Sequence, residues 1–277
     1  MKLYKTSSGN IIETKNQYFG IDEDWDTLIN RDGLLEYLQA HCSNADPLPD
    51  SWTIPDRKLE PPVGSQEIWA SGVTYYNSRE ARMDESRDSG GGDFYDRVYN
   101  AERPELFLKA TPYRAVGSGQ NVRIRRDSGW NVPEPELTLV INSKKEIVGY
   151  TIGNDMSSRD IEGENPLYLP QAKCYDGSAA VGPCIYITDK PLGGNTRIHI
   201  EITRGNELVF EEAVEVKMIK RKFEELVHYL FLEYSFPSGA LLMTGTGIVP
   251  PNDFTLQKGD EIKITIDKIG TLINNVA

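Results

Sequence analysis

The segment Pro133-Glu-Pro-Glu-Leu-Thr-Leu-Val-Ile141 has the pattern of a β-strand that begins with two acidic side chains at alternate positions. Residues i and i+2 of a strand point to the same face, roughly 6–7 Å apart. Glu134 and Glu136 would therefore lie side by side, and Asp155 follows the next apolar run. Buried together, such acids repel one another. A divalent cation removes this cost, because Mg²⁺, Mn²⁺ and Ca²⁺ prefer carboxylate oxygen. The pattern predicts a metal site at these three residues.

Length and composition are those of an ordinary globular protein. The 277 residues include 39% apolar and 26% charged side chains, enough to bury a large core. Apolar stretches fall far short of the roughly 18 residues that a membrane helix needs, and the first residues lack the apolar run of a signal peptide. We therefore expect a cytoplasmic protein without a membrane partner. A net charge of −12, with no block rich in lysine and arginine, argues against nucleic acid as a partner.

The chain divides into a small first unit and a larger β-rich part. A hairpin around residues 8–10 and a helix near residues 34–41 precede a proline-rich connection, so we expect a small N-terminal domain over residues 1–64 and a catalytic domain over residues 65–277. Helical spacing predicts two further helices near residues 77–87 and 223–232. Strands are expected at residues 68–73, 106–109, 137–141, 147–152, 184–188, 198–203 and 262–266. The predicted class is α+β, mainly β and mostly antiparallel.

Short motifs along residues 67–250 resemble the fumarylacetoacetate hydrolase superfamily. They are Gly72-Val-Thr-Tyr75, Pro104-Glu-Leu-Phe-Leu-Lys109, Glu134-x-Glu136, Gly153-Asn-Asp155, Gln171-Ala-Lys-Cys-Tyr-Asp-Gly177, Val181-Gly-Pro183 and Thr244-Gly-Thr-Gly-Ile-Val-Pro250. Each is weak alone, but their order and spacing are specific. The resemblance implies a mixed β-roll core and a divalent cation, usually Mg²⁺ with Mn²⁺ or Ca²⁺ as substitutes, held by Glu134, Glu136 and Asp155. It also implies a homo-oligomer, either a dimer or a tetramer.

Several further residues are candidates for binding a substrate. Mg²⁺ and three carboxylates carry a net charge of −1, so Lys173 would restore neutrality and ease the binding of an anionic substrate. Thr246, between two glycines, could offer its hydroxyl and backbone N–H groups to a substrate carboxylate, or it could simply form a tight turn. Ser78 and Arg79, on the predicted helix, could bind the carboxylate or distal hydroxyls, or they could lie on a solvated face.

Carbon–carbon hydrolases of the superfamily usually carry a His–Glu pair that activates water, but this chain lacks the histidine. The matching position falls at Ser78, and the three histidines, His41, His199 and His228, lie elsewhere in the sequence. Glu105 and the segment Ser158-Arg-Asp-Ile-Glu-Gly-Glu-Asn-Pro-Leu-Tyr168 instead resemble the dehydratase branch. This resemblance implies a lyase of pentose catabolism that removes water from a 2-keto-3-deoxy sugar acid, converting 2-keto-3-deoxy-D-arabinonate to 2,5-dioxopentanoate. Glu105 and Lys173 are the candidates for the proton transfers.

Two alternatives stay open at this point. One is an acylpyruvate or β-diketone hydrolase in which Glu80 or Glu85 activates the water, with oxaloacetate decarboxylation as a variant that needs no such base. The other is a metal-binding β-domain that serves as an interaction module without turnover. All the enzymatic interpretations require a small 2-oxo acid or diketone as substrate, because two adjacent oxygens of such a compound can chelate the cation.

Overall fold

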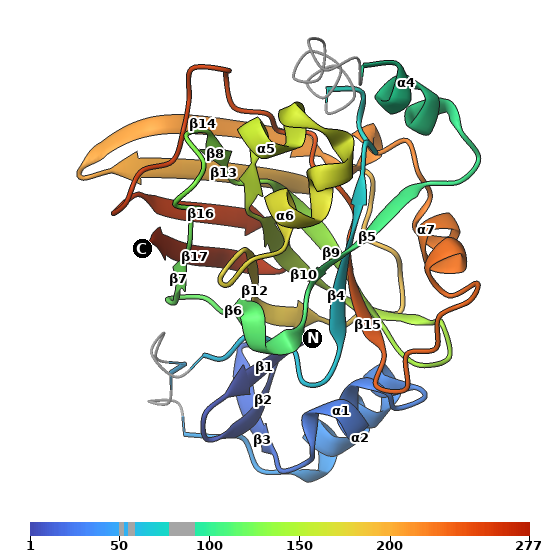
Figure 1. The fold of residues 1–277 in the computed structure, drawn as a ribbon. Coiled ribbons are helices and arrows are strands. Elements are labelled where there is room, and N and C mark those ends of the chain that lie inside the picture. Colours follow the sequence, from blue (N-terminus) through green and yellow to red (C-terminus); the bar gives the residue numbers. More distant parts are fainter. Residues whose placement is uncertain (50–52, 55–58, 78–91) are drawn as a thin grey trace.

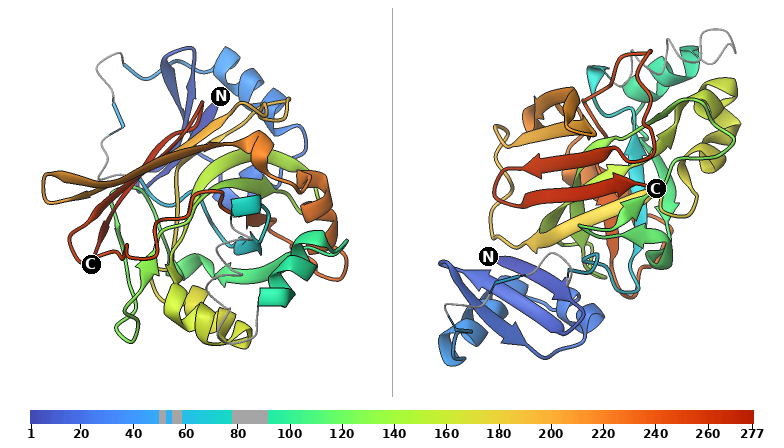
Figure 2. Two further views of the ribbon diagram at one scale, coloured as in Figure 1. Left: turned by 90° about the horizontal axis from the view of Figure 1, so that it is seen from above. Right: turned by 90° about the vertical axis from the view of Figure 1, so that its left-hand side faces the viewer.

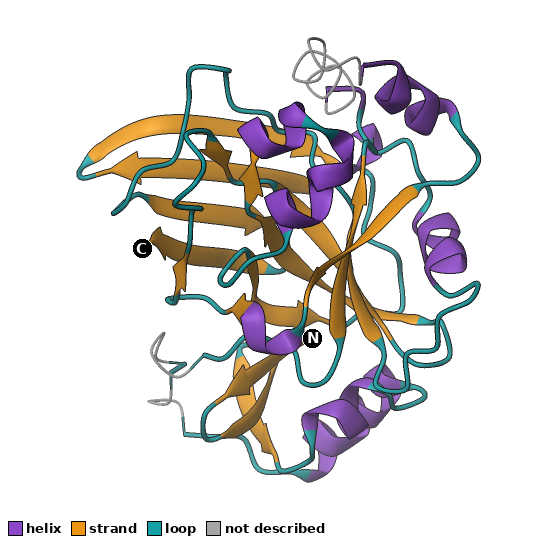
Figure 3. Cartoon of the chain, viewed as in Figure 1, coloured by secondary structure: helices purple, strands orange, loops and turns teal. Residues whose placement is uncertain are grey.

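The structure is a computed structural model that describes residues 1–49, 53–54, 59–77 and 92–277. Strands dominate it, and the helices lie outside them (Figure 3). The predicted class, α+β and mainly β with mixed sheets, is confirmed. No helix in the described ranges has both the length and the apolar character needed to cross a membrane.

The chain begins with an antiparallel meander of β1 (Lys2–Thr6), β2 (Gly9–Thr14) and β3 (Gln17–Ile21), followed by helices α1 (Trp25–Ile29) and α2 (Leu34–Asn44). Asp24 caps the start of helix α1: its side chain accepts a hydrogen bond from the backbone N–H of Thr27 at 3.0 Å, as preferred at a helix start. In the right-hand view of Figure 2 this blue unit lies at one end of the molecule. Strand β1 also pairs with a strand of the larger part, with Lys2 opposite Tyr186. The division after residue 64 stays a prediction.

A large mixed sheet holds the centre of the described structure (Figure 1). Its strands run in the order β3-β2-β1-β12-β10-β9-β15-β4-β5, with β6 beside β12. Most pairs are antiparallel, whereas β15 with β4 and β12 with β6 are parallel. The members not yet introduced are β4 (Glu67–Gly72), β5 (Glu105–Ala110), β6 (Ala115–Val116), β9 (Pro135–Ile141), β10 (Ile147–Asp155), β12 (Ala179–Tyr186) and β15 (Ala240–Met243).

A second sheet packs against the first through an apolar core. It has the order β14-β13-β16-β17-β7, formed by β7 (Asn121–Val122), β13 (Arg197–Arg204), β14 (Glu207–Glu215), β16 (Glu261–Ile266) and β17 (Gly270–Val276). Ile198, Ile200 and Ile202 alternate along β13 and are fully buried, and the same core contains Leu137 and Leu139 of β9. The period of two in the sequence therefore gives one buried face, as expected of a strand.

Short elements complete the fold. Strands β8 (Asn131–Val132) and β11 (Ser157–Ser158) pair with each other. The helices are α4 (Gly92–Asn100), α5 (Arg159–Glu164), α6 (Leu169–Lys173) and α7 (Phe223–Leu230). Leu226, Val227 and Leu230 are the buried residues of α7, so the helix predicted over residues 223–232 is present and faces the core. The helix predicted over residues 77–87 falls almost wholly outside the described residues.

Candidate metal centre and active site

Three carboxylates meet at one end of the large sheet. Glu134 precedes β9, Glu136 lies within it, and Asp155 ends the neighbouring strand β10. The register places Gly153 opposite Glu136, and the backbone N–H of Asp155 donates to the carbonyl of Glu134 at 2.9 Å. Each of the three residues is at most 4% exposed, and each offers an oxygen within 4.8 Å of an oxygen of the others. The alternation and the adjacency of two strands thus bring together the three predicted ligands.

The electrostatics of this trio (Glu134, Glu136 and Asp155) suit a cation. Burial, together with the charges of Asp155 and Glu134, raises the pKa of Glu136 well above its usual range. The backbone N–H of Gly245 donates a hydrogen bond to Glu136 Oε2 at 2.5 Å, and this bond acts to lower the pKa of Glu136. Three buried oxygen donors that repel one another fit a hard divalent ion such as Mg²⁺.

The described residues contain one other group whose possible ligand atoms all lie within 4.8 Å of one another. It consists of His199, Glu201 and Glu211 on the second sheet. Glu211 is exposed there, and the other two residues are half-buried. Of these two groups among the described residues, only the trio on the large sheet combines burial with three acidic oxygen donors.

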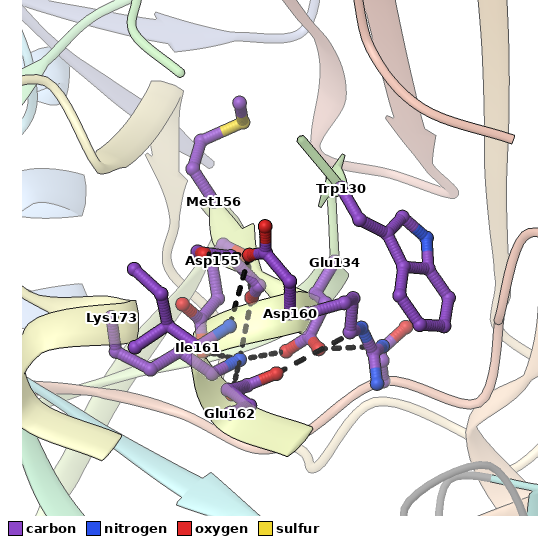
Figure 4. A network of polar contacts seen from close by, with 12 residues as sticks. Trp130, Glu134, Asp155, Met156, Asp160, Ile161, Glu162 and Lys173 are labelled. Carbon is purple, nitrogen blue, oxygen red and sulfur yellow. Dashed lines mark hydrogen bonds and ion pairs between the residues drawn. The ribbon is translucent and has the colours of Figure 1, made fainter. Parts of the chain in front are cut away.

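Lys173, the last residue of α6, reaches into the trio. Its Nζ donates to Glu134 Oε2 at 2.5 Å, to Asp155 Oδ2 at 3.0 Å and to Ser157 Oγ at 2.6 Å. The residue is fully buried. Figure 4 shows Lys173, Glu134 and Asp155 pointing toward one another. The structure therefore places this lysine in direct contact with two of the three predicted ligands.

Three buried charged residues with no predicted role surround the trio. Lys109 Nζ lies 2.6 Å from Asp155 Oδ1, and Arg159 Nη2 lies 2.8 Å from Glu134 Oε1. Glu162 lies 3.4 Å from Lys173 Nζ. Burial has the largest effect on the pKa of Lys109 and lowers it, whereas the negative charge of Asp155 acts to raise it. Four carboxylates therefore face three cations, a formal balance of −1 that would become +1 with a divalent ion.

A small cavity of about 10 Å³ borders the trio. Its wall is formed by Ser71, Gly72, Val73, Phe107, Glu134, Glu136, Asp155, Arg159, Lys173, Gly245 and Thr246. Val73 has a φ of 53°, a left-handed conformation that is unusual for a β-branched residue and costs conformational energy. Such strain is concentrated at functional sites in proteins. Here it lies in the chain segment that follows β4 and borders the cavity.

Glu105, the predicted proton-transfer residue, lies beside this cavity. It is paired with Gly72 across β4 and β5. A Cβ atom on Gly72 would stand 2.1 Å from Glu105 Oε2, so the carboxylate lies directly over this glycine of the cavity wall. The absence of a side chain at Gly72 is what allows Glu105 to lie there.

Thr246 is part of the cavity wall, but its hydroxyl is engaged in a local turn. Oγ1 accepts from the backbone N–H of Ile248 at 3.1 Å and donates to the Ile248 carbonyl at 3.2 Å. The preceding Gly245 has a φ of 90°, and a Cβ atom there would lie 2.0 Å from Thr74 Oγ1. Only glycine fits this conformation without a clash, and the conformation lets the backbone N–H of Gly245 reach Glu136.

Ser78 and Arg79, the other predicted substrate contacts, lie outside the described residues. The three histidines all lie within them and away from the cavity wall. His41 is on α2, His199 on β13 and His228 on α7.

Comparisons with known proteins agree with this geometry. The family model described as fumarylacetoacetate (FAA) hydrolase C-terminal matches residues 76–277. A probable 2-keto-3-deoxyxylonate dehydratase from Haloferax volcanii is 46% identical over 235 residues, 84% of this chain and 79% of that protein. A 2-dehydro-3-deoxy-D-arabinonate dehydratase from Saccharolobus solfataricus is 43% identical over 228 residues, 82% of this chain and 76% of that protein.

Solved structures extend the similarity to the whole chain. The apo form of 2-keto-3-deoxy-D-arabinonate dehydratase is 36% identical, with a TM-score of 0.85, and the match covers 100% of this chain and 98% of that one. A structure of the same dehydratase complexed with magnesium and 2,5-dioxopentanoate matches with a TM-score of 0.82 and the same coverage. The resemblance found in the sequence is confirmed, and the chain belongs to the fumarylacetoacetate hydrolase family.

Proposed function

We propose that this chain is a Mg²⁺-dependent dehydratase that converts 2-keto-3-deoxy-D-arabinonate to 2,5-dioxopentanoate. The observation that carries the proposal is the buried trio with the Lys173 ammonium in contact with two of its members. Relatives named as dehydratases of this substrate or of 2-keto-3-deoxyxylonate, at 43% and 46% identity, support it. So does the magnesium complex of the 36% identical dehydratase.

The trio would hold the cation, and the surrounding residues would handle the substrate. When bound, Mg²⁺ supplies a Lewis acid for the carboxylate and C2 keto oxygens of a 2-oxo acid, which favours loss of a proton from C3. The formal charge of +1 in the loaded site suits a substrate with a single carboxylate.

Glu105 and Lys173 are the groups that we assign to the proton transfers. Dehydration breaks a C3–H bond and the C4–OH bond and releases water. A proton shift from C5 to C3 then gives the enol C4=C5–OH, and transfer of its hydroxyl proton to C4 completes the aldehyde of the product. One group removes the C3 proton and the other protonates the departing hydroxyl. The two residues come from different elements, β5 and α6, so each can be replaced without removing the support of the other.

The test is turnover by the purified protein. With Mg²⁺ and 2-keto-3-deoxy-D-arabinonate we expect 2,5-dioxopentanoate, and we expect no product from Glu136→Ala. In D₂O, the variant that lacks the base should lose exchange of the C3 hydrogens as well as dehydration. The variant that lacks the acid should keep exchange and lose dehydration. Cleavage of acylpyruvates to pyruvate and an acid, with no dehydration, would overturn the proposal.

The runner-up is the acylpyruvate or β-diketone hydrolase, with oxaloacetate decarboxylase as its variant. No histidine stands among the described residues of the cavity wall, which disfavours the His–Glu chemistry of the hydrolases. Glu80 and Glu85, its alternative water-activating groups, lie outside the described residues. A pure interaction module would not require Lys173 within a full set of buried carboxylates.

Assembly and location belong to the same proposal. We propose a cytoplasmic homo-oligomer, a dimer or a tetramer, that has a small-molecule 2-oxo acid as its substrate. Light scattering coupled to size-exclusion chromatography measures the assembly directly, and a mass of 31 kDa would contradict it, since one chain weighs 31.1 kDa.

A further inference from the structure

Glu162 is a buried carboxylate next to the trio that the proposed reaction does not use. It lies on α5, and its side chain is 1% exposed. Oε1 lies 3.4 Å from Lys173 Nζ, and Oε2 lies 3.9 Å from Arg159 Nε. Burying a carboxylate is costly unless cations pair with it, so these two neighbours explain how the residue is tolerated. Figure 4 shows Glu162 beside Lys173 in the polar network.

The contacts of Lys173 explain why a fourth carboxylate is useful. An ammonium has three donors, and here they face Glu134, Asp155 and Ser157. Two of these acceptors are proposed cation ligands. A divalent ion held by the same carboxylates draws on their lone pairs and repels the ammonium. In the loaded site, Lys173 therefore needs an anion that does not bind the metal.

Glu162 meets this requirement. It is not one of the three residues whose oxygens all lie within 4.8 Å of one another, so it stands outside the cation site. Its distance of 3.4 Å from Lys173 Nζ lets a small movement of the ammonium form a direct hydrogen bond.

The negative charge of Glu162 also helps to set the net charge of the cavity. With Glu162, the seven buried charged residues of the site and a bound divalent ion carry +1, not counting the half-buried Glu105, and one substrate carboxylate neutralises this charge. Without it the loaded site would carry +2.

We propose that Glu162 is a positioning residue, which keeps Lys173 beside the substrate when the cation is bound and matches the charge of the loaded cavity to one 2-oxo acid carboxylate. This inference rests on the proposed function. Glu162→Gln should weaken Mg²⁺ binding on the order of tenfold, because a negative charge near the cation is lost. It should lower kcat on the order of a hundredfold, because Lys173 is displaced. KM should not rise, because a more positive cavity binds an anion at least as tightly.

The matched control is Glu164→Gln, which removes the same charge from an exposed position of the same helix. Mg²⁺ affinity is measured by calorimetry on the metal-free protein, and kcat and KM are measured separately. A Glu162→Gln variant that matches the control in both Mg²⁺ affinity and kcat overturns the inference, as does a rise in KM with unchanged kcat. If that variant does not fold, Glu162→Asp retains the charge but withdraws it from Lys173. This second variant should keep its Mg²⁺ affinity within about threefold of the native value and lose kcat, and an unchanged kcat overturns the inference.

Binding of pyruvate, a monoanionic 2-oxo acid, separates this inference from the proposed function. With Mg²⁺ present, Glu162→Gln should bind pyruvate as tightly as the native protein or more tightly. If the native protein fails to dehydrate the sugar acid but the Mg²⁺ and pyruvate affinities shift as expected, the proposed function fails and the role of Glu162 in the charge balance stands. Weaker pyruvate binding by the variant overturns the charge argument.

Discussion

Replacing Lys109 with methionine tests whether buried cations stabilise the trio in the absence of metal. Lys109 is fully buried, lies 2.6 Å from Asp155 Oδ1, and donates to the carbonyls of Met156 at 2.8 Å and Lys173 at 2.5 Å. Removing one partner of a buried ion pair costs about 3–5 kcal/mol, because the other charge is left uncompensated. For domains near this size, 1 kcal/mol corresponds to roughly 2–4 °C, so we expect metal-free Lys109→Met to melt about 6–20 °C lower.

Mg²⁺ should narrow this difference, because a cation beside Asp155 restores part of the missing positive charge. The assay is thermal and urea unfolding of native protein and variant, each with and without saturating Mg²⁺. Lys144→Met is the control: this side chain is 60% exposed and pairs with Asp32 on the surface, so we expect a loss below about 1 kcal/mol that Mg²⁺ does not change. A Lys109→Met variant as stable as this control, or one equally destabilised with and without Mg²⁺, would refute the reasoning.

Two further substitutions test the cavity wall and the first turn of helix α5. Gly72→Ala would place a methyl group 2.1 Å from Glu105 Oε2. Displacing that carboxylate should lower kcat on the order of a hundredfold with no change in Mg²⁺ affinity, and a native kcat would contradict the role of Glu105. Burial acts to raise the pKa of Asp160, but hydrogen bonds from Ser128, Ser158 and backbone N–H groups lower it. Its stabilising contribution should therefore be present above about pH 4 and lost as pH falls through the lowered pKa. Asp160→Asn should melt below the native protein at pH 7, and this difference should shrink as pH falls below about 4 in a series of melting curves; a difference independent of pH would contradict this.

The strands with one clear apolar face were the part of the fold that could be predicted from the sequence. Ile198, Ile200 and Ile202 alternate with polar residues, and β13 is present there. Strand β14, with the sequence Glu207-Leu-Val-Phe-Glu-Glu-Ala-Val-Glu215, was not predicted. It lies at the edge of the second sheet and pairs only with β13 among the described strands, so neither of its faces needs to be strongly apolar. Helices α5 and α6 are too short for their periodicity to be recognised.

In the site, the residues that are spaced along one strand could be predicted from the sequence, whereas the residues that meet through contacts between elements could not. Glu134 and Glu136 follow from the i, i+2 rule. Lys109 stands at the end of the apolar run Glu-Leu-Phe-Leu-Lys-Ala, which could have marked it as buried, but its partner Asp155 is 46 residues away along the chain. Arg159 and Glu162 are three residues apart on one helix, a spacing equally common on solvated faces. Only the packing of α5 against the trio gives these residues a role. Ser78 and Arg79 stay predictions.

The position of the metal itself decides whether the trio is the cation site. We expect crystals grown or soaked with Mn²⁺, measured at a wavelength where manganese scatters anomalously, to show one strong peak between the carboxylates of Glu134, Glu136 and Asp155. Crystals of Glu136→Ala should lack it. A peak only at His199, Glu201 and Glu211, or no peak in either crystal, would show that the trio does not bind the catalytic cation.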